Sequence, residues 1–231
     1  MNSFCKIGLL LIVTLGLCSC SNKEIPTPPI SYLALGDSYT IGESVNSSET
    51  WPIQLIDSLR VMDISSIPPR IIAKTGWRTD QLRDSLENDL SIGSNYDLVS
   101  LLIGVNNQVQ GQTVEDFDVE FAGMLAKAIS YAGSDPERVI VLSIPDYGKT
   151  DFGQYLGGDR ISAEIDLYNE SIKKNCLLQG VEFFDITPIS REVVNDESLL
   201  ADDNFHPSRK MYREWVELIF SKVHTTILSK R

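Results

Sequence analysis

The stretch ISYLALGDSYT, residues 30–40, decides the fold. It opens with a short apolar run, Ile30 to Leu35, and a glycine and a polar segment follow directly. Such a run, bounded by a turn signal, is typical of a buried strand. Polar residues just after a buried strand stand where α/β proteins bind their ligands. The stretch therefore predicts a central strand with a polar site at its carboxyl end.

Four further apolar runs of this kind follow along the chain, at residues 70–73, 98–103, 139–144 and 181–186. Segments of helical period separate them, the clearest at residues 114–129 and 212–227. Short apolar strands that alternate with amphipathic helices predict a parallel sheet covered on both faces. We expect an α/β fold with five parallel strands in the flavodoxin-like order 2-1-3-4-5, which puts the segments after the first and third strands side by side.

The first nineteen residues have the features of an export signal. Lys6 precedes an eleven-residue apolar run from Ile7 to Leu17, which is shorter than the roughly 20 residues of a membrane-spanning helix. The run ends in Leu-Cys-Ser-Cys, which resembles a bacterial lipobox. The small Ser19 before Cys20 satisfies that pattern, whereas Leu17 before Cys18 does not. We expect cleavage before Cys20 and lipidation of Cys20, the alternative being an ordinary secretory signal with incidental cysteines.

Residues 20–29 then predict a lipidated cysteine and a flexible tether, and residues 30–231 a single folded domain. The protein would be an exported bacterial lipoprotein, held on a membrane by its lipid and monomeric. Its net charge of −12 argues against nucleic acid as a partner. Cys176 would be the only cysteine of the mature domain without a lipid, so no internal disulfide is expected, and it falls on the apolar face of a predicted helix.

Three residues in the predicted loops have the chemistry of nucleophilic catalysis. Ser38 follows the first strand, although a serine there is more often a helix cap than a nucleophile. The mature chain has two histidines, and His224 lies within the predicted C-terminal helix. His206 lies in a polar loop before that helix, with Asp203 three residues earlier, close enough to accept the imidazole Nδ1–H. A loop histidine with an incidental acid is the simpler alternative.

An acyl-transfer site also needs donors where negative charge develops on the substrate oxygen. Asn106 follows the third strand and offers a side-chain amide, and Gly76 follows the second strand and offers a backbone N–H. Each could also be an ordinary turn residue. Both positions belong to the edge of the sheet that holds Ser38.

Taken together, these blocks resemble the GDSL, or SGNH, hydrolases: Gly36-Asp37-Ser38-Tyr39, then Gly76, then Gly104-Val105-Asn106-Asn107, and finally Asp203-x-x-His206. The resemblance covers residues 31–220 and implies a three-layer α/β/α fold that hydrolyses esters or thioesters without a metal or organic cofactor. It implies Ser38 as nucleophile, His206 as general base and acid, and Asp203 as the residue that orients His206. Gly76 and Asn106 would join the Ser38 backbone N–H in the oxyanion hole.

Two positions depart from the family pattern. Tyr39 stands where the family name has leucine, which alters packing and pocket lining rather than chemistry. Asn107 stands where the usual pattern has aspartate, which leaves open the hydrogen bonds that this acid supports. Asp202 is adjacent to Asp203 and is the alternative orienting acid.

The substrate is not specified by these motifs. Tyr39, Trp77, Gln110 and Tyr147 are expected to line the pocket, where aromatic rings suit either a sugar or an acyl chain. Location outside the cytoplasm favours a carbohydrate O-acetyl or other short-chain carboxylesterase over the alternatives, a lysophospholipase or other lipid esterase and a thioesterase. Two non-enzymatic alternatives are a flavodoxin-like binding module and a non-catalytic carbohydrate-binding relative. Against the first, Asp37 and Glu43 would repel a bound phosphate.

Overall fold

The computed structural model describes residue 1 and residues 27–231, so the predicted signal sequence, Cys20 and most of the tether lie outside the described residues. A five-stranded sheet in the order β2-β1-β3-β4-β5 forms the centre of the domain, and every neighbouring pair is parallel. The predicted fold class and strand order are confirmed. The strands are β1 (Tyr32–Gly36), β2 (Arg70–Ala73), β3 (Leu98–Leu102), β4 (Val139–Leu142) and β5 (Glu182–Phe184).

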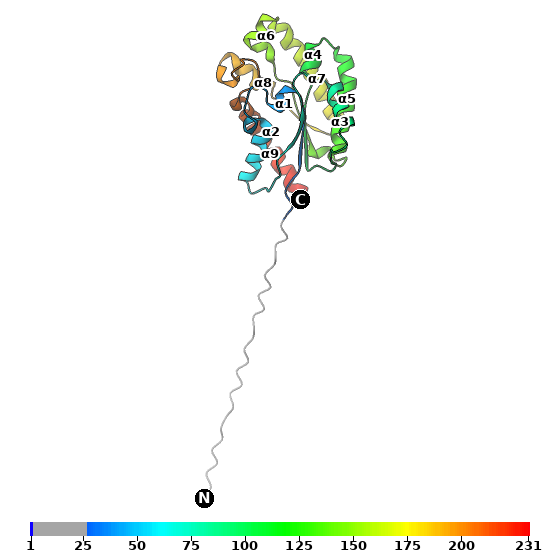
Figure 1. Ribbon diagram of the computed structural model, residues 1–231, viewed down its shortest axis with the longest axis vertical. Helices are drawn as coiled ribbons and strands as arrows, with labels where there is room; N and C mark the ends of the chain where they lie inside the picture. The colour runs from blue at the N-terminus through cyan, green and yellow to red at the C-terminus, as the bar shows by residue number, and fades with distance from the viewer. Residues whose placement is uncertain (2–26) are drawn as a thin grey trace.

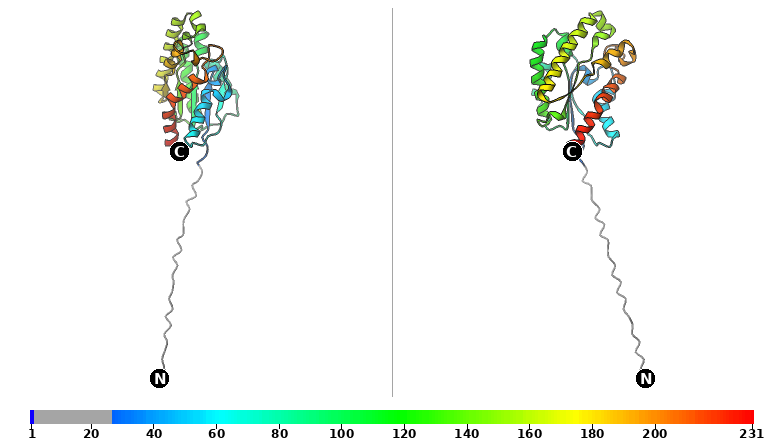
Figure 2. Two further views of the ribbon diagram at one scale, coloured as in Figure 1. Left: turned by 90° about the vertical axis from the view of Figure 1, so that its left-hand side faces the viewer. Right: turned by 180° about the vertical axis from the view of Figure 1, so that it is seen from behind.

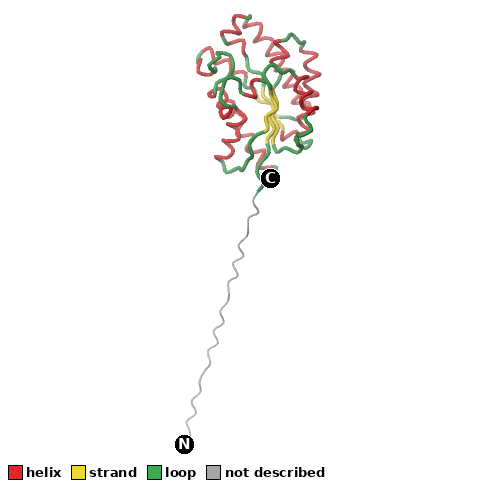
Figure 3. The backbone as a smooth tube through the Cα atoms, viewed as in Figure 1, coloured by secondary structure: helices red, strands yellow, loops and turns green. Residues whose placement is uncertain are grey.

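Helices cover both faces of this sheet and complete three layers (Figures 1 and 2). On one face α5 (Val114–Tyr131) packs against both α3 (Thr79–Asn88) and α7 (Gly158–Gln179). On the other face α2 (Trp51–Val61) packs along α9 (Arg209–Ser229). Figure 3 shows the sheet edge-on between the two helical layers. Four short helices lie in the connections: α1 (Ser38–Ile41), α4 (Val105–Val109), α6 (Asp151–Tyr155) and α8 (Thr187–Arg191).

Both predicted helical stripes are confirmed, and they correspond to α5 and α9. The apolar face that carries Cys176 belongs to α7, and the buried Cys176 thiol packs there as a small apolar group. Burial raises the pKa of this thiol to about 12, so the cysteine is protonated near neutral pH. None of the helices within residues 27–231 is both long and apolar enough to cross a membrane.

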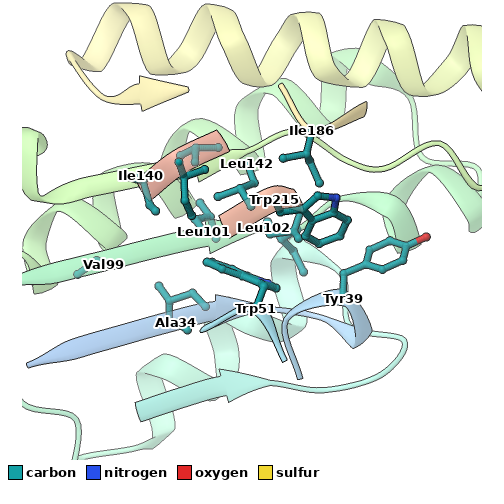
Figure 4. Close-up of a cluster of buried hydrophobic side chains, with 14 of the residues drawn as sticks. Ala34, Tyr39, Trp51, Val99, Leu101, Leu102, Ile140, Leu142, Ile186 and Trp215 are labelled. Carbon is teal, nitrogen blue, oxygen red and sulfur yellow. The ribbon is translucent and has the colours of Figure 1, made fainter. Parts of the chain in front are cut away.

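Two tryptophans anchor the layer between the sheet and α2 and α9. Trp51 begins α2, Trp215 lies in the middle of α9, and neither is exposed to solvent. Figure 4 shows both rings against side chains of β1, β3 and β4, with Tyr39 at the end of the cluster nearest the polar edge. Burial of an aromatic side chain removes about 150–250 Å² from water, which stabilises the fold by roughly 4–6 kcal/mol per ring. The packing of the two rings holds α2 and α9 against the sheet.

Strand register determines which loops meet. Gly36 at the end of β1 is aligned with Ala73 of β2 on one side and with Leu102 of β3 on the other. The three strands therefore end at the same level. The residues that follow them, around Ser38, Gly76 and Asn106, come together at the carboxyl edge of the sheet, as expected for a site at a change of strand order.

Candidate active site

Ser38 is the first residue of α1, and it follows β1 after a tight turn. Asp37, rather than Ser38, caps this helix: its carboxylate accepts a hydrogen bond from the Tyr39 backbone N–H at 3.0 Å. Gly36 is required at the turn because a Cβ there would overlap Thr40 Oγ1 and the Leu102 carbonyl oxygen. Within residues 27–231 the Ser38 hydroxyl has no hydrogen-bond partner. Ser38 is therefore not the cap of this helix.

His206 is held by Asp203 in the loop that precedes α9. Its Nδ1 lies 2.6 Å from Asp203 Oδ2, and Asp203 Oδ1 accepts hydrogen bonds from the backbone N–H groups of Phe205 and His206, each at 2.9 Å. A donor at Nδ1 leaves Nε2 of a neutral imidazole as an acceptor. The exposed Asp202 makes no contact of this kind. The arrangement is the one expected of a histidine oriented to act as a base.

The histidine loop packs directly against the helix that carries Ser38. The ring of Tyr39, the next residue after Ser38, meets the His206 ring edge-on with centroids 5.8 Å apart. The described residues include no direct hydrogen bond between the Ser38 hydroxyl and the imidazole, and such bonds are often long before substrate binds. His224 is remote from this edge: it stacks on Phe220 within α9, with ring centroids 5.6 Å apart.

Donors for an oxyanion surround the same edge. Among the described residues, the backbone N–H groups of Ser38 and Gly76 find no acceptor. Gly76 adopts φ +82°, and a Cβ there would meet no atom within 4 Å, so the glycine is needed for its backbone conformation. Asn106 Nδ2 donates to the Trp77 carbonyl at 2.9 Å, which uses one of its two protons and orients the other.

Asn107, at the departure from the family pattern, connects the loops that carry Gly76 and Asn106. It is fully buried, its Oδ1 accepts from the Thr79 N–H at 3.2 Å, and its Nδ2 donates to Thr79 Oγ1 at 2.7 Å and to Gln112 Oε1 at 2.6 Å. The Thr79 hydroxyl in turn donates a hydrogen bond to Glu120 Oε2 at 2.5 Å. An amide both donates and accepts, so Asn107 fastens the loop after β2 to the loop after β3.

The four residues expected to line the pocket differ in exposure. Tyr39 and Tyr147 are buried, with the Tyr147 hydroxyl donating to Gln108 Oε1 at 2.8 Å. Trp77 is half-buried beside Asn106, and the exposed Gln110 accepts from Arg78 at 3.1 Å.

An aromatic cluster beside His206 was not anticipated. The Phe205 ring lies edge-on to His206 at 4.8 Å and to Phe152 of α6 at 5.5 Å, and Phe152 is half-exposed. Phe205 directly precedes His206 in the sequence, but nothing in the pattern signalled that α6 would approach it.

The sequence matches the family model of the GDSL-like lipase/acylhydrolase family over residues 34–214, well over half of the chain. The chain belongs to this family. It is therefore a hydrolase of ester bonds, which favours the enzymatic interpretation over both binding-module alternatives. Comparison with curated protein sequences gives no match.

Solved structures of other hydrolases share the fold of this acylhydrolase. TesA is 17% identical with a TM-score of 0.66, and the match covers 85% of this chain and 99% of TesA. A lipase/acylhydrolase from Enterococcus faecalis is 19% identical with a TM-score of 0.66, covering 85% and 96%. Axe2, an acetylxylan esterase from Geobacillus stearothermophilus, is 17% identical with a TM-score of 0.62, covering 84% and 94%. At these low sequence identities, the similarity to the three structures shows that the fold is shared and nothing more.

The two neighbouring acids of this acylhydrolase are expected to differ sharply in importance. Asp203→Asn should lower kcat by about 10⁴-fold, the loss measured when an amide replaces the acid of a serine–histidine–acid triad and the wrong tautomer results. Asp202→Asn should stay within about twofold of the wild type, because its side chain does not contact His206. Steady-state kinetics on a chromogenic ester compares the two variants, and equal losses would contradict the assignment.

A buried acid, Asp37, gives the acylhydrolase a pH-dependent stability. Burial raises the pKa of Asp37 from 3.8 to about 7, with the hydrogen bond from the Tyr39 N–H lowering it in part, and Asp37 Oδ2 is buried without a partner among the described residues. The unfolded chain releases this proton near pH 4, whereas the folded protein retains it. Stability should therefore fall as pH rises from about 4 to about 7 and then level off.

Asp37→Asn removes that dependence. Its free energy of unfolding should exceed that of the wild type at pH 8 by on the order of 2–4 kcal/mol and match it at pH 4. Asp146 provides the matched control, because it is equally buried but paired with Arg191 Nε at 2.8 Å. Asp146→Asn should destabilise the protein at pH 8, because it removes the buried one of the two carboxylates that pair with Arg191, the other being Asp166. Urea unfolding at both pH values measures the differences, and a gain for Asp146→Asn would contradict this account.

Proposed function

We propose that the protein is a serine esterase that works through an acyl-enzyme. His206 Nε2 takes the proton of the Ser38 hydroxyl as Ser38 Oγ attacks the ester carbonyl carbon. The imidazolium then gives this proton to the leaving alcohol as the C–O bond breaks. In the second half, His206 takes a proton from water, the resulting hydroxide attacks the acyl-enzyme, and the proton returns to Ser38 as the acid leaves.

The observation that carries this proposal is the Asp203–His206 contact of 2.6 Å, in a loop packed against the helix that begins at Ser38. Asp203 fixes the tautomer and stabilises the imidazolium that forms. The unpaired N–H groups of Ser38 and Gly76, with Asn106 Nδ2, would receive the charge that develops on the carbonyl oxygen. Removing one such donor costs about 10²–10³-fold in turnover.

For the substrate we favour a carbohydrate O-acetyl ester or another short-chain ester, over a lysophospholipid, another lipid ester or a thioester. Phe152 offers a half-exposed ring near His206, and exposed rings suit stacking on a sugar. Its helix is firmly fixed: Thr150 Oγ1 accepts from the Gly153 N–H at 3.1 Å, and Gln154 Nε2 donates to the Gly148 carbonyl at 2.6 Å. The acetylxylan esterase with the same fold acts on esters of this class.

The position at which the chain enters the domain also favours a soluble or glycan ester as the substrate. Ile30 lies at the amino edge of the sheet beside the C-terminus, whereas Ser38 lies at the carboxyl edge (Figure 1). If Cys20 carries a lipid, the ten residues 20–29 reach at most about 35 Å, whereas a domain of this size is roughly 40 Å across. The site would then face away from the membrane, toward soluble or glycan esters.

A substrate panel tests the class of ester. We expect acetylated oligosaccharides and p-nitrophenyl acetate to be hydrolysed far faster than p-nitrophenyl esters of long acids. Phe152→Ala should raise KM for the acetylated oligosaccharide by about tenfold, from the loss of one ring contact, and leave p-nitrophenyl acetate unchanged. Leu167→Ala on α7 is the control, since Leu167 and Phe152 are each 53% exposed. A preference for long acyl chains would favour the lipid-esterase alternative.

We also propose that the protein is an exported lipoprotein anchored through Cys20. The support is the lipobox-like sequence and the tether, residues 21–29, that follows it. Cys20→Ser should release the protein from the membrane fraction and abolish incorporation of a labelled fatty acid. Cys18→Ser is the control and should leave both unchanged. Lipid labelling that persists in Cys20→Ser and disappears in Cys18→Ser would move the anchor to Cys18.

A further inference from the structure

Ser44 combines a costly backbone conformation with a contact to the catalytic loop. It adopts φ +64°, in the left-handed region that disfavours residues other than glycine, asparagine and aspartate. Its hydroxyl donates a hydrogen bond of 2.6 Å to Asp203 Oδ2, across 159 positions of sequence. Ser44 caps no helix, because α1 ends at Ile41 and Gly42 is its C-cap. A serine kept where glycine would be less strained indicates a use for its hydroxyl.

The Ser44 hydroxyl completes the hydrogen bonding of the Asp203 carboxylate. Oδ1 accepts the two backbone N–H groups, and Oδ2 accepts both His206 Nδ1 and Ser44 Oγ, each at 2.6 Å. A carboxylate has about four acceptor positions, so all are filled. Burial raises the pKa of Asp203, but the hydrogen bonds from Ser44, His206 and the backbone outweigh burial and lower the pKa to about 2. The acid is therefore fully charged in the range where esterases work.

The surroundings of this pair are otherwise acidic. Burial is the main reason that the pKa of the Tyr212 hydroxyl on α9 is raised, and the charges of Asp37, Asp203 and Glu43 raise it further. Asp37 lies in the turn before α1 and Glu43 in the segment after it. Asp202 is adjacent in the loop. Tyr39 and Tyr212 face the pair as neutral groups, since burial raises the pKa of both well above 10. Carboxylates near an imidazole favour its protonated form, in which it cannot act as a base.

We propose that Ser44 is a positioning residue for the histidine of this esterase. Its hydroxyl holds Asp203 Oδ2 toward His206 Nδ1 and takes up part of the carboxylate charge, so that the imidazole stays neutral and free to accept a proton. This role rests on the proposed function, because it presumes that His206 deprotonates Ser38. The contact between Ser44 and the Asp203–His206 pair is nevertheless measurable without any substrate.

Ser44→Gly separates the hydroxyl from the backbone. Glycine accepts the left-handed conformation, and this relief of strain offsets the lost hydrogen bond, so the variant should stay folded with a melting temperature close to that of the wild type. Its kcat should fall by about fivefold to twentyfold with KM unchanged, as expected for loss of one hydrogen bond to a charged group. The acidic limb of its pH–rate profile should move to higher pH by several tenths of a unit, because the carboxylate attracts the imidazolium more strongly.

Two further variants serve as controls. Ser134 adopts φ +61° in a turn after α5, and its hydroxyl makes no hydrogen bond to the described residues. Ser134→Gly relieves the same backbone strain without losing a hydrogen bond, so it should be more stable to heat than the wild type, with kcat and pH profile unchanged. Ser44→Asn tolerates the left-handed conformation and brings N–H donors near Asp203, so it should recover part of the lost kcat.

Titration of the two histidine rings by NMR tests the effect of Ser44 on the Asp203–His206 pair without measuring activity. In Ser44→Gly the His206 midpoint should rise by several tenths of a pH unit while that of His224 stays fixed. A His206 midpoint and a kcat that both stay at wild-type values in Ser44→Gly would overturn the proposal. If instead the midpoint moves but the wild type hydrolyses no ester, the contact is as described and the proposed function fails.

Discussion

Ser38→Ala is expected to lower kcat by about 10⁶-fold, the loss measured when the serine of such a triad is removed from an enzyme of this chemistry. The reason is that Ser38 would supply the atom that bonds to the acyl group, and no other hydroxyl occupies the end of β1 in the same position. Stability should hardly change. Within residues 27–231 the Ser38 hydroxyl makes no hydrogen bond, and Asp37 provides the helix cap.

Labelling with a fluorophosphonate measures the same assignment directly, because this reagent bonds covalently to an activated serine. The wild type should be labelled once, at Ser38, and Ser38→Ala should not be labelled. Thr40→Ala is the matched control, since Thr40 lies on the same short helix with a buried hydroxyl and should retain labelling. Labelling that persists in Ser38→Ala would show that another residue is the nucleophile.

The sequence was sufficient for the features that depend on local pattern. The buried runs gave five strands, and the order that they suggested is the order observed, with Ser38, Gly76 and Asn106 at one edge. The placement of these three residues could be predicted because the carboxyl ends of parallel strands lie at the same edge of a sheet, whatever the side chains are. Asp203 and His206 are three residues apart, so their contact also follows from local geometry.

Features that depend on distant contacts could not be predicted. Ser44 reaches Asp203 across 159 positions, and the approach of Phe152 to Phe205 depends on how α6 is fixed. The helix α2 was not expected, although Trp51 makes it a main part of the core. The effect of Asn107 was left open for the same reason, since its partner Thr79 lies 28 positions away at the start of α3.

The second large effect is expected at the histidine. His206→Ala should lower kcat by about as much as the loss of Ser38, about 10⁶-fold, because a serine hydroxyl without a base is a poor nucleophile. Asp203 would then be left with the donors from Ser44 and the backbone only, so the loop should remain folded. The double variant Ser38→Ala/His206→Ala should be no slower than either single variant, since residues that act as a unit are not additive.

His224→Ala is the matched control for His206→Ala. His224 stacks on Phe220 on the surface side of α9, so its loss should cost at most a little stability and leave kcat within about twofold. Steady-state kinetics on p-nitrophenyl acetate measures all four proteins. Retained activity in His206→Ala would mean that the base is elsewhere. An additive loss in the double variant would mean that Ser38 and His206 act in separate steps, which the 5.8 Å contact between the neighbouring Tyr39 ring and His206 argues against.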